Sequence, residues 1–259
     1  MIRHGLAIIL LTLISQLGGI AWLVAIVLRP VARFWTVFVL AYLGLSVGAH
    51  YVAPGFGRVP LPCLDAGPTQ IAVLNPVYCA LNRNYVDPAL KSHADALAAQ
   101  MHDDFPGTRT RALDAGFPFV EGFPLLPHLS HDDGQKLDLA LYYTDQDGTY
   151  QLGRARSPIG YWAFEQPPAN AATLCDADGG FGLRWDMDWA QSYMRPWPLD
   201  EDRTAAALAW LANNPTGTDY AVFVEPHLAE RLGVNADVIR FQGCQAARHD
   251  DHIHLQFQP

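Results

Sequence analysis

The first 53 residues contain no Asp or Glu, and this feature constrains the fold more than any other. Residues 5–28 form a 24-residue run without a charged side chain, and a second apolar run extends from residue 34 to about residue 53. A helix needs about 20 apolar residues to cross a bilayer. We therefore predict a membrane anchor, residues 1–53, in which two transmembrane helices contact the lipid bilayer through residues 5–53. The alternative is a cleaved signal peptide, but its apolar region is typically about 7–15 residues long.

The cysteines indicate on which side of the membrane the rest of the chain lies. Cys63, Cys79, Cys175 and Cys244 all follow the anchor, and none of them forms a Cys-x-x-Cys pair. Four well-spaced cysteines predict two disulfides, which persist in oxidising compartments. The alternative is buried free thiols. We expect an extracytoplasmic body, although the arginines of the anchor, Arg3, Arg29 and Arg33, do not by themselves settle its orientation.

The remaining 206 residues hold 14 basic and 26 acidic side chains. This acidic balance makes a nucleic-acid partner unlikely, because a phosphate backbone is held by basic groups. The body is also too apolar to be disordered and long enough for one core. We divide it into a linker and N-terminal part with a helix that begins at Asp87-Pro88, residues 54–107, and a core, residues 108–259. Helical stretches alternate with strand-like pieces, so we predict an α+β fold with an antiparallel β-sheet core and flanking helices.

Five of the ten histidines fall into two short clusters, residues 128–138 and 249–254. In the second cluster His252 and His254 alternate with Ile253, Leu255 and Phe257, so a strand would place both imidazoles on one face. The first cluster leads into a similar strand, in which Leu137, Leu139 and Leu141 share one face and Asp138 lies on the other. Each cluster therefore predicts a strand with one apolar face and one polar face.

Imidazole and carboxylate groups are the ligands that zinc accepts, and three such ligands with a water form a catalytic site. His131, Asp138 and one member of the His252/His254 pair meet this requirement. A bound water also needs a base that takes its proton, and the second histidine of the pair can supply it. The sequence therefore predicts one zinc ion per chain at the meeting point of the two clusters.

These residues resemble the signature of the LAS metallopeptidases, the group of D-alanyl-D-alanine peptidases and lysostaphin-type enzymes. The match is closest to the penicillin-insensitive murein endopeptidases. Their motif His-x-Ser-His-x-x-Gly-x-x-x-Asp is met by His128, Ser130, His131, Gly134 and Asp138. Their motif His-Asp-Asp-His-aromatic-His is met by His249, Asp250, Asp251, His252 and His254, with Ile253 at the aromatic position. The resemblance covers about residues 108–258.

The resemblance implies a LAS/D-Ala-D-Ala peptidase-like fold and zinc bound by His131, Asp138 and His254. It also implies that His252 is the general base, with His128 and His249 flanking the metal as further catalytic residues. The implied activity is hydrolysis of peptide bonds in peptidoglycan stems or cross-links (D,D-endopeptidase-like) by a protein anchored in the bacterial inner membrane, with a periplasmic catalytic domain. This chain departs from the family in its membrane anchor and in Pro127, which stands where we expect an arginine.

Two alternatives follow from the same residues. A D-Ala carboxypeptidase would use the same chemistry, and a non-catalytic cell-wall-binding or regulatory module would keep the fold without needing His252. The oligomeric state stays open.

Several other residues are given lesser roles. Tyr142 shares a face with Asp138 and could donate to an oxyanion, and a Cys175–Cys244 bond would join the middle loop to the second motif. The aspartates beside the histidines are interpreted as partners that orient the imidazoles. The tryptophans at positions 185, 189, 197 and 210 are interpreted as core residues.

Overall fold

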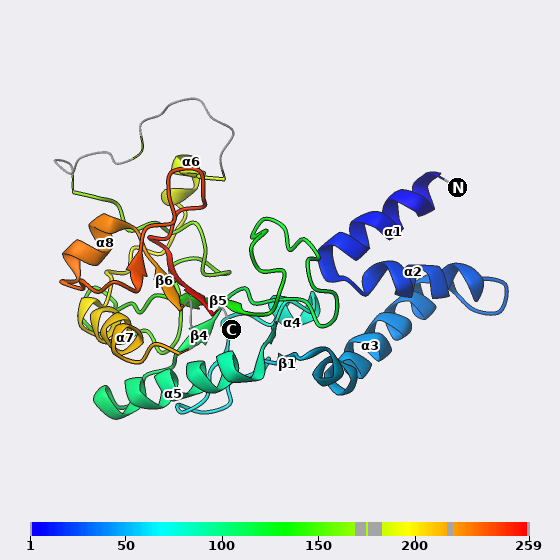
Figure 1. The fold of residues 1–259 in the computed structure, drawn as a ribbon. Helices are drawn as coiled ribbons and strands as arrows, with labels where there is room; N and C mark the ends of the chain where they lie inside the picture. Colours follow the sequence, from blue (N-terminus) through cyan, green and yellow to red (C-terminus); the bar gives the residue numbers. More distant parts are fainter. Residues whose placement is uncertain (1, 169–174, 176–182, 217–219, 258–259) are drawn as a thin grey trace.

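The structure is a computed structural model that describes residues 2–168, 175, 183–216 and 220–257. Its N-terminal helices lie beside a mixed α/β body (Figure 1). The helices are α1 (Ile2–Ser15), α2 (Gly18–Val27), α3 (Phe34–Val52), the short 3-10 helix η1 (Ala53–Phe56), α4 (Val77–Ala80), α5 (Pro88–Asp104), α6 (Asp188–Gln191), α7 (Glu201–Asn213) and α8 (Pro226–Arg231). The strands are β1 (Val59–Pro60), β2 (Ala72–Val73), β3 (Tyr85–Val86), β4 (Arg111–Ala112), β5 (Lys136–Ala140), β6 (Ala221–Phe223), β7 (Ile239–Arg240) and β8 (His252–Gln256).

The main sheet of the described residues has the strand order β2-β4-β5-β8-β6-β7. Its central strands β4, β5, β8 and β6 pair antiparallel, as predicted. The two edges differ from the prediction, because β2 pairs parallel with β4 and β7 pairs parallel with β6. The sheet is therefore mixed, with an antiparallel centre. The two strands that carry the predicted metal ligands Asp138 and His254, β5 and β8, are neighbours in that centre.

Helices α5 and α7 contribute to the core on the apolar face of the sheet. Leu90 and Leu97 from α5 and Leu208 from α7 lie in the same buried cluster as Leu139 and Leu255 from the sheet. Helix α5 begins where the sequence predicts, since the side chain of Asp87 accepts a hydrogen bond from the Ala89 N–H. Helix α7 is capped in the same way, by the side chain of Asp200, which accepts from the Arg203 N–H. Such caps satisfy N–H groups that a helix cannot pair internally.

The prediction that residues 5–28 form one transmembrane helix is wrong. This run is broken into α1 and α2, of 14 and 10 residues, and each is shorter than the length a bilayer crossing needs. Gln16 at the break has a φ of 60°, and the Ser15 hydroxyl accepts a hydrogen bond from the Gly18 N–H at the start of α2. A Cβ atom at Gly19 would lie 1.9 Å from Thr12 Oγ1, so only glycine permits this close approach of α1 and α2.

One helical segment within the described residues is long and apolar enough to cross a membrane. This is α3 with η1, residues 34–56, with a mean hydropathy of 1.6. Of the two predicted transmembrane helices, only the second therefore has the required length. The structure therefore supports one candidate membrane helix near the N-terminus.

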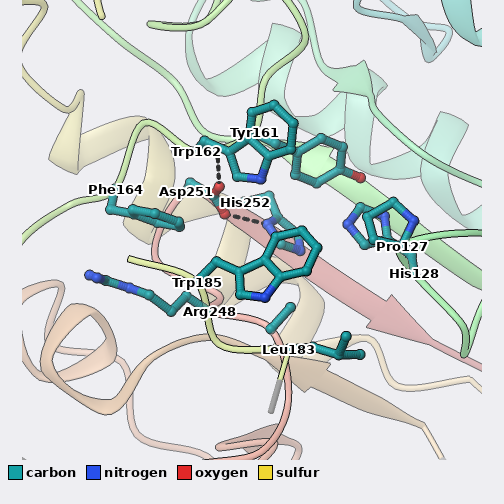
Figure 2. Close-up of a pocket in the computed structure, with 11 residues that line it drawn as sticks. Pro127, His128, Tyr161, Trp162, Phe164, Leu183, Trp185, Arg248, Asp251 and His252 are labelled. Atoms are coloured by element: carbon teal, nitrogen blue, oxygen red, sulfur yellow. Dashed lines mark hydrogen bonds and ion pairs between the residues drawn. The ribbon is translucent and has the colours of Figure 1, made fainter. Parts of the chain in front are cut away.

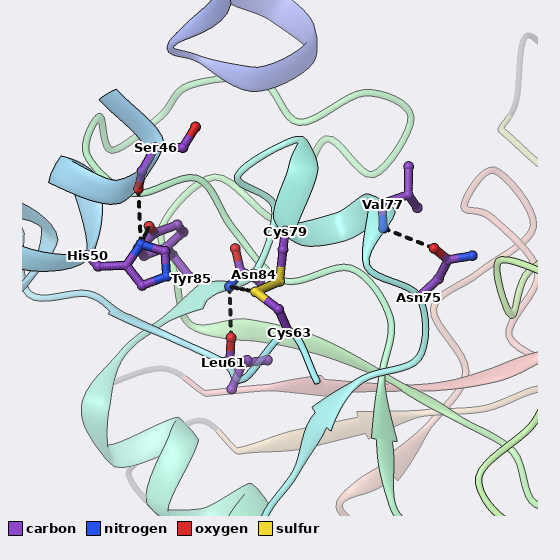
Figure 3. The surroundings of a disulfide bond; sticks show 9 residues. All are labelled: Ser46, His50, Leu61, Cys63, Asn75, Val77, Cys79, Asn84 and Tyr85. Carbon is purple, nitrogen blue, oxygen red and sulfur yellow. Dashed lines mark hydrogen bonds between the residues drawn. A yellow bond between two sulfur atoms is a disulfide. The ribbon is translucent and has the colours of Figure 1, made fainter. Parts of the chain in front are cut away.

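Both predicted disulfides are present. Cys63 bonds to Cys79, and Cys175 bonds to Cys244, as the sequence favoured. The Cys63–Cys79 bond closes a loop between α3 and α5, and Figure 3 shows it near the end of α3 that carries Ser46 and His50. Two disulfides are compatible with an extracytoplasmic body, because such bonds persist where thiols are oxidised.

Candidate metal centre

The candidate site lies on one face of the β5–β8 pair. In the register of this pair Asp138 stands opposite His254, and Ala140 stands opposite His252. The alternate residues of both strands, including Leu139 and Ile253, point into the apolar core. The polar face is itself covered, since Asp138, His252 and His254 are each no more than 3% exposed. The period-two alternation predicted from the sequence is therefore confirmed, and it gathers charged groups in a buried position.

Three potential ligand atoms converge at the centre of this face. His131 Nε2 lies 3.2 Å from His254 Nδ1 and 3.3 Å from Asp138 Oδ1, and His254 Nδ1 lies 2.8 Å from Asp138 Oδ1. Ligand atoms about 2.0–2.1 Å from a tetrahedral zinc ion are separated by roughly 3.3 Å, close to the first two of these distances. These buried His and Asp groups can therefore hold a metal ion.

The orientation of His131 also suits a ligand. Its Nδ1 lies 2.8 Å from the backbone carbonyl oxygen of Ala115, which can only accept a hydrogen bond. Nδ1 must therefore carry a proton, and Nε2 is the ring nitrogen that faces Asp138 and His254. The fold thus turns toward the other two candidate ligands the nitrogen through which His131 would bind a metal ion.

The charges and the burial of the cluster keep Asp138 ionised and His254 neutral. Burial raises the pKa of Asp138, but the neighbouring His131 and His252 outweigh it and lower this pKa well below its ordinary value, so the carboxylate is ionised. Burial lowers the pKa of His254 to about 4, so that imidazole is neutral. An ionised carboxylate beside a neutral imidazole provides the lone pairs that a cation binds.

His252 stands beside the converging ligands and has its own carboxylate partner. Its Nε2 lies 3.7 Å from Asp138 Oδ1, and its Nδ1 lies 2.5 Å from Asp251 Oδ1. The second oxygen of Asp251 accepts a hydrogen bond from the Trp162 N–H at 2.5 Å (Figure 2). Burial lowers the pKa of His252, but Asp138 and Asp251 outweigh it and raise this pKa to about 9. Asp251 therefore orients the imidazole, as expected for an aspartate beside a histidine.

His128 and His249 also lie where the sequence places them, around the same centre. His128 Nδ1 lies 3.0 Å from Asp114 Oδ2 and 3.5 Å from Asp138 Oδ2. The ring of His249 lies 4.8 Å from that of His252, between ring centroids. Burial, together with the charge of His252, lowers the pKa of His249 well below its ordinary value, so this imidazole is neutral. The six predicted site residues thus form one cluster.

The other aspartates beside the histidines do not orient imidazoles as strongly as Asp251 does. Asp250 forms an ion pair with Arg248, with Arg248 Nη2 2.5 Å from Asp250 Oδ2, and its contact with an imidazole, that of His227, is longer at 3.5 Å. Asp133 pairs with Lys136, and Asp132 accepts a hydrogen bond from Arg58 through its backbone oxygen. The prediction that an aspartate orients the neighbouring imidazole therefore holds for Asp251. It is wrong for Asp132, Asp133 and Asp250, whose main partners are basic side chains.

The tyrosine at the site is Tyr161, and the prediction that Tyr142 lies there is wrong. Tyr142 lies in the apolar core, where its hydroxyl is 2.8 Å from that of Thr110, so it is not at the site. Tyr161 instead donates a hydrogen bond to Asp138 Oδ2 at 2.5 Å. No motif spacing marks Tyr161, because it comes from an irregular loop that approaches β5 only in the folded chain.

The metal centre opens into a hollow of about 230 Å³ that includes Ser130, Leu183 and Gln242 in its lining. A smaller adjoining pocket has aromatic walls formed by Tyr161, Trp162, Phe164 and Trp185 (Figure 2). Trp185 is 47% exposed, and Trp189 is 72% exposed, so the interpretation of both as core residues is wrong. Trp197 and Trp210 do pack against the core.

No model of a known protein family matches this chain, and no curated protein matches it in sequence.

Proposed function

We propose that this protein is a zinc-dependent metallopeptidase, with zinc bound by His131, Asp138 and His254. The observation that carries the proposal is the convergence of His131 Nε2, Asp138 Oδ1 and His254 Nδ1 within 3.3 Å of one another. Two imidazoles and one carboxylate form a ligand set typical of a catalytic zinc ion, which keeps a further position for water or substrate. When bound, such an ion supplies Lewis-acid chemistry: it polarises a carbonyl group and makes a water molecule more acidic.

His252 is the general base in this proposal. Asp251 holds the ring through Nδ1, so Nε2 is directed toward the side of Asp138. A base must be neutral to accept a proton. Asp138 and Asp251, however, raise the pKa of His252 to about 9, which favours the protonated ring. A cation that neutralises Asp138 removes one of these contributions and favours the neutral ring. His252 then takes the proton of the attacking water and transfers it to the leaving amine.

His128 and His249 complete the catalytic cluster. Because His249 is neutral and fully enclosed, it adds no positive charge next to His252. His128 lines the hollow beside the metal ligands, so its ring flanks the place where the substrate would bind. Together these groups supply a base and a ligand set, and a bound zinc ion would stabilise the oxygen on which negative charge develops.

The proposed substrate is a peptidoglycan peptide, at its stem or cross-link. Support comes from the resemblance of both motifs to the penicillin-insensitive murein endopeptidases of the LAS group, together with the disulfides and the candidate membrane helix. We place the protein in the bacterial cytoplasmic membrane with its body on the outer, periplasmic side. Peptidoglycan lies on that side, so a membrane-anchored body would have access to it.

The test is to incubate the purified full chain in detergent with cross-linked muropeptides, and to measure released amines and product masses. We expect cleavage that a chelator abolishes and zinc restores, with about one zinc ion per chain. Monomeric products indicate an endopeptidase, and loss of a single terminal alanine indicates a carboxypeptidase. If the zinc-loaded protein releases no amine from any muropeptide, the peptidase proposal is wrong and a non-catalytic wall-binding module is favoured.

A further inference from the structure

We propose that Arg83 is a positioning residue for the proposed peptidase: it holds Asp114 so that Asp114 fixes the ring of His128 at the metal centre. The inference rests on the proposed function for its kinetic consequences, but its structural part can be tested without activity. Arg83 precedes β3 in the segment between α4 and α5, outside the part of the chain that resembles known peptidases.

The Arg83 guanidinium group binds both oxygens of the Asp114 carboxylate, and the contact is largely buried. Arg83 Nε donates to Asp114 Oδ1 at 2.7 Å, and Arg83 Nη2 donates to Asp114 Oδ2. The side chains of Arg83 and Asp114 are 11% and 3% exposed. A planar guanidinium that binds both carboxylate oxygens fixes the plane of the carboxylate as well as its position. A lysine in place of Arg83 would preserve the charge but not this geometry.

Asp114 then determines the state of His128. Its Oδ2 atom lies 3.0 Å from His128 Nδ1, and an ionised carboxylate can only accept a hydrogen bond. The proton of a neutral His128 is therefore held on Nδ1, and Nε2 is left unprotonated. Arg83 also donates from Nη1 to the backbone oxygen of Leu126 at 2.8 Å, two residues before His128. One arginine thus fixes both the partner of the ring and the loop that carries it.

Asp114 is connected to a metal ligand through its backbone as well. Its carbonyl oxygen accepts a hydrogen bond from the Asp138 N–H at 2.9 Å, and its own N–H donates to the Tyr161 hydroxyl at 3.1 Å. Tyr161 in turn donates to Asp138 Oδ2. A displacement of Asp114 would therefore disturb His128 and Asp138 together, so its anchoring by Arg83 matters to the whole cluster.

The segment that carries Arg83 is attached to the candidate membrane helix α3. Asn82 Nδ2 donates to the Tyr42 hydroxyl at 3.0 Å, and that hydroxyl donates to the Ala80 backbone oxygen at 2.6 Å. On the other side of Arg83, the Tyr85 hydroxyl lies 3.2 Å from His50 Nδ1 (Figure 3). The segment between α3 and the sheet therefore contacts α3 and also places Arg83 beside Asp114, next to the metal centre.

The experiment uses the zinc-loaded full chain in detergent with ¹⁵N-labelled histidine rings. NMR is recorded at about pH 8, where an ordinary histidine is neutral, to read which ring nitrogen of His128 carries the proton. The His128 signals are assigned by their loss in His128→Gln. The variants are Arg83→Met, Arg83→Lys and Asp114→Asn, with Arg109→Met as control because Arg109 pairs with Asp65 away from the site.

In the wild type and in Arg109→Met we expect the proton of His128 on Nδ1. Asp114→Asn should move it to Nε2, because an amide group can donate to Nδ1. Arg83→Met should give a mixture of both forms, and Arg83→Lys should give a smaller but measurable share of the Nε2 form, because it keeps the charge but not the contact with both carboxylate oxygens. On cleavable muropeptide, Arg83→Met should lower kcat by about 10–100-fold with little change in KM, the range seen when partners of ligands are removed.

An unchanged His128 signal in both Arg83→Met and Asp114→Asn would overturn the inference. If Arg83→Met does not fold, Asp114→Asn and Arg83→Lys decide it, since neither removes the charge of Arg83. If the wild type cleaves no peptide, the proposed function fails, whereas the NMR result still decides whether Arg83 and Asp114 position His128.

Discussion

Asp138 and His254 face each other across the β5–β8 pair, with Asp138 Oδ1 2.8 Å from His254 Nδ1. The two residues are separated by 116 positions in the chain, and the register of one strand pair brings them together. His131 reaches the same point from the turn before β5, with its Nε2 3.3 Å from Asp138 Oδ1. Asp138 is therefore the residue on which the candidate ligand set is centred, and the first prediction concerns it.

Asp138→Asn should weaken zinc binding by more than about 100-fold, because loss of a partner of a ligand alone costs about 10–100-fold. An amide is a neutral and poorer ligand than an ionised carboxylate. The measurement is zinc content by mass spectrometry and zinc affinity by competition with a chelator. The matched control is Asp133→Asn, since Asp133 pairs with Lys136 and lies five residues before Asp138. Equal zinc affinity in the two variants would contradict the assignment of Asp138 as a ligand.

His252→Ala should reduce kcat by about 100–10,000-fold, the range in which a general base contributes. The zinc content should stay near that of the wild type, because His252 is not among the proposed ligands. His102→Ala serves as control, since the described contact of His102 is with the Gly107 N–H, away from the site. Both zinc content and muropeptide cleavage are measured. Loss of zinc from His252→Ala would identify this residue as a ligand rather than a base.

The Cys175–Cys244 disulfide should stabilise the part of the chain that carries the second histidine motif. It spans 69 residues, and Cys244 lies five positions before His249. Closing a loop of this length in the unfolded chain is worth about 4 kcal/mol by the chain-entropy model. A Cys175→Ser/Cys244→Ser double variant should therefore lose about 2–4 kcal/mol of unfolding free energy and release zinc faster. An unchanged denaturation midpoint and an unchanged zinc release rate would exclude this role.

The stability of the body should fall in mild acid partly because of His93. This residue is 7% exposed, its Nε2 lies 3.3 Å from the Tyr220 hydroxyl, and burial lowers its pKa from 6.5 to about 4. Below pH 6.5 the unfolded chain binds a proton that the folded chain resists, so stability falls as the pH drops toward 4, by up to roughly 3 kcal/mol.

His93→Gln removes this titration, because an amide can still bond to Tyr220 but does not bind a proton in this range. The measurement is the unfolding free energy of both proteins as a function of pH. The wild type should lose more stability than the variant between pH 6.5 and about 4. Parallel curves for the two proteins would show that His93 does not contribute.

The chain should behave as a membrane protein through α3. In cells, it should resist extraction by alkaline carbonate, and deletion of residues 34–56 should abolish that resistance. Protease added to spheroplasts should cleave the body if it faces outward, and an intact body that is cut only after lysis would place it in the cytoplasm. Deletion of residues 2–15 offers a comparison, because α1 alone is too short to cross a bilayer.

Local pattern was sufficient to predict which residues of β5 and β8 share a face. Strict alternation in residues 252–257 and around Asp138 determines side-chain direction whatever the partner strand is. Asp87 likewise predicts the start of α5, because a cap acts within three residues of itself. The parallel pairing of the edge strands β2 and β7 was not predictable in the same way, since it depends on where distant segments return to the sheet.

The break at Gln16 and the position of Tyr161 were not predicted, and the two have a common cause. Composition shows that residues 5–28 are apolar, but the break at Gln16 depends on Gly18 and Gly19 packing against α1 and on the Gln16 side chain accepting a bond from the Phe119 N–H at 3.1 Å. Similarly, Tyr161 carries no motif and reaches Asp138 only through the path of its loop. Both outcomes depend on contacts between residues far apart in the chain.

The sequence by itself determined the apolar N-terminus, the period-two strands and the types of residue available to bind a metal, because these depend on side-chain chemistry and on near neighbours. The tertiary structure decided the register that sets Asp138 against His254, the orientation of the His131 ring and the Arg83–Asp114–His128 contact. These depend on distances of about 3 Å between atoms whose residues are separated by up to 116 positions. Only the packing of the whole sheet sets such distances.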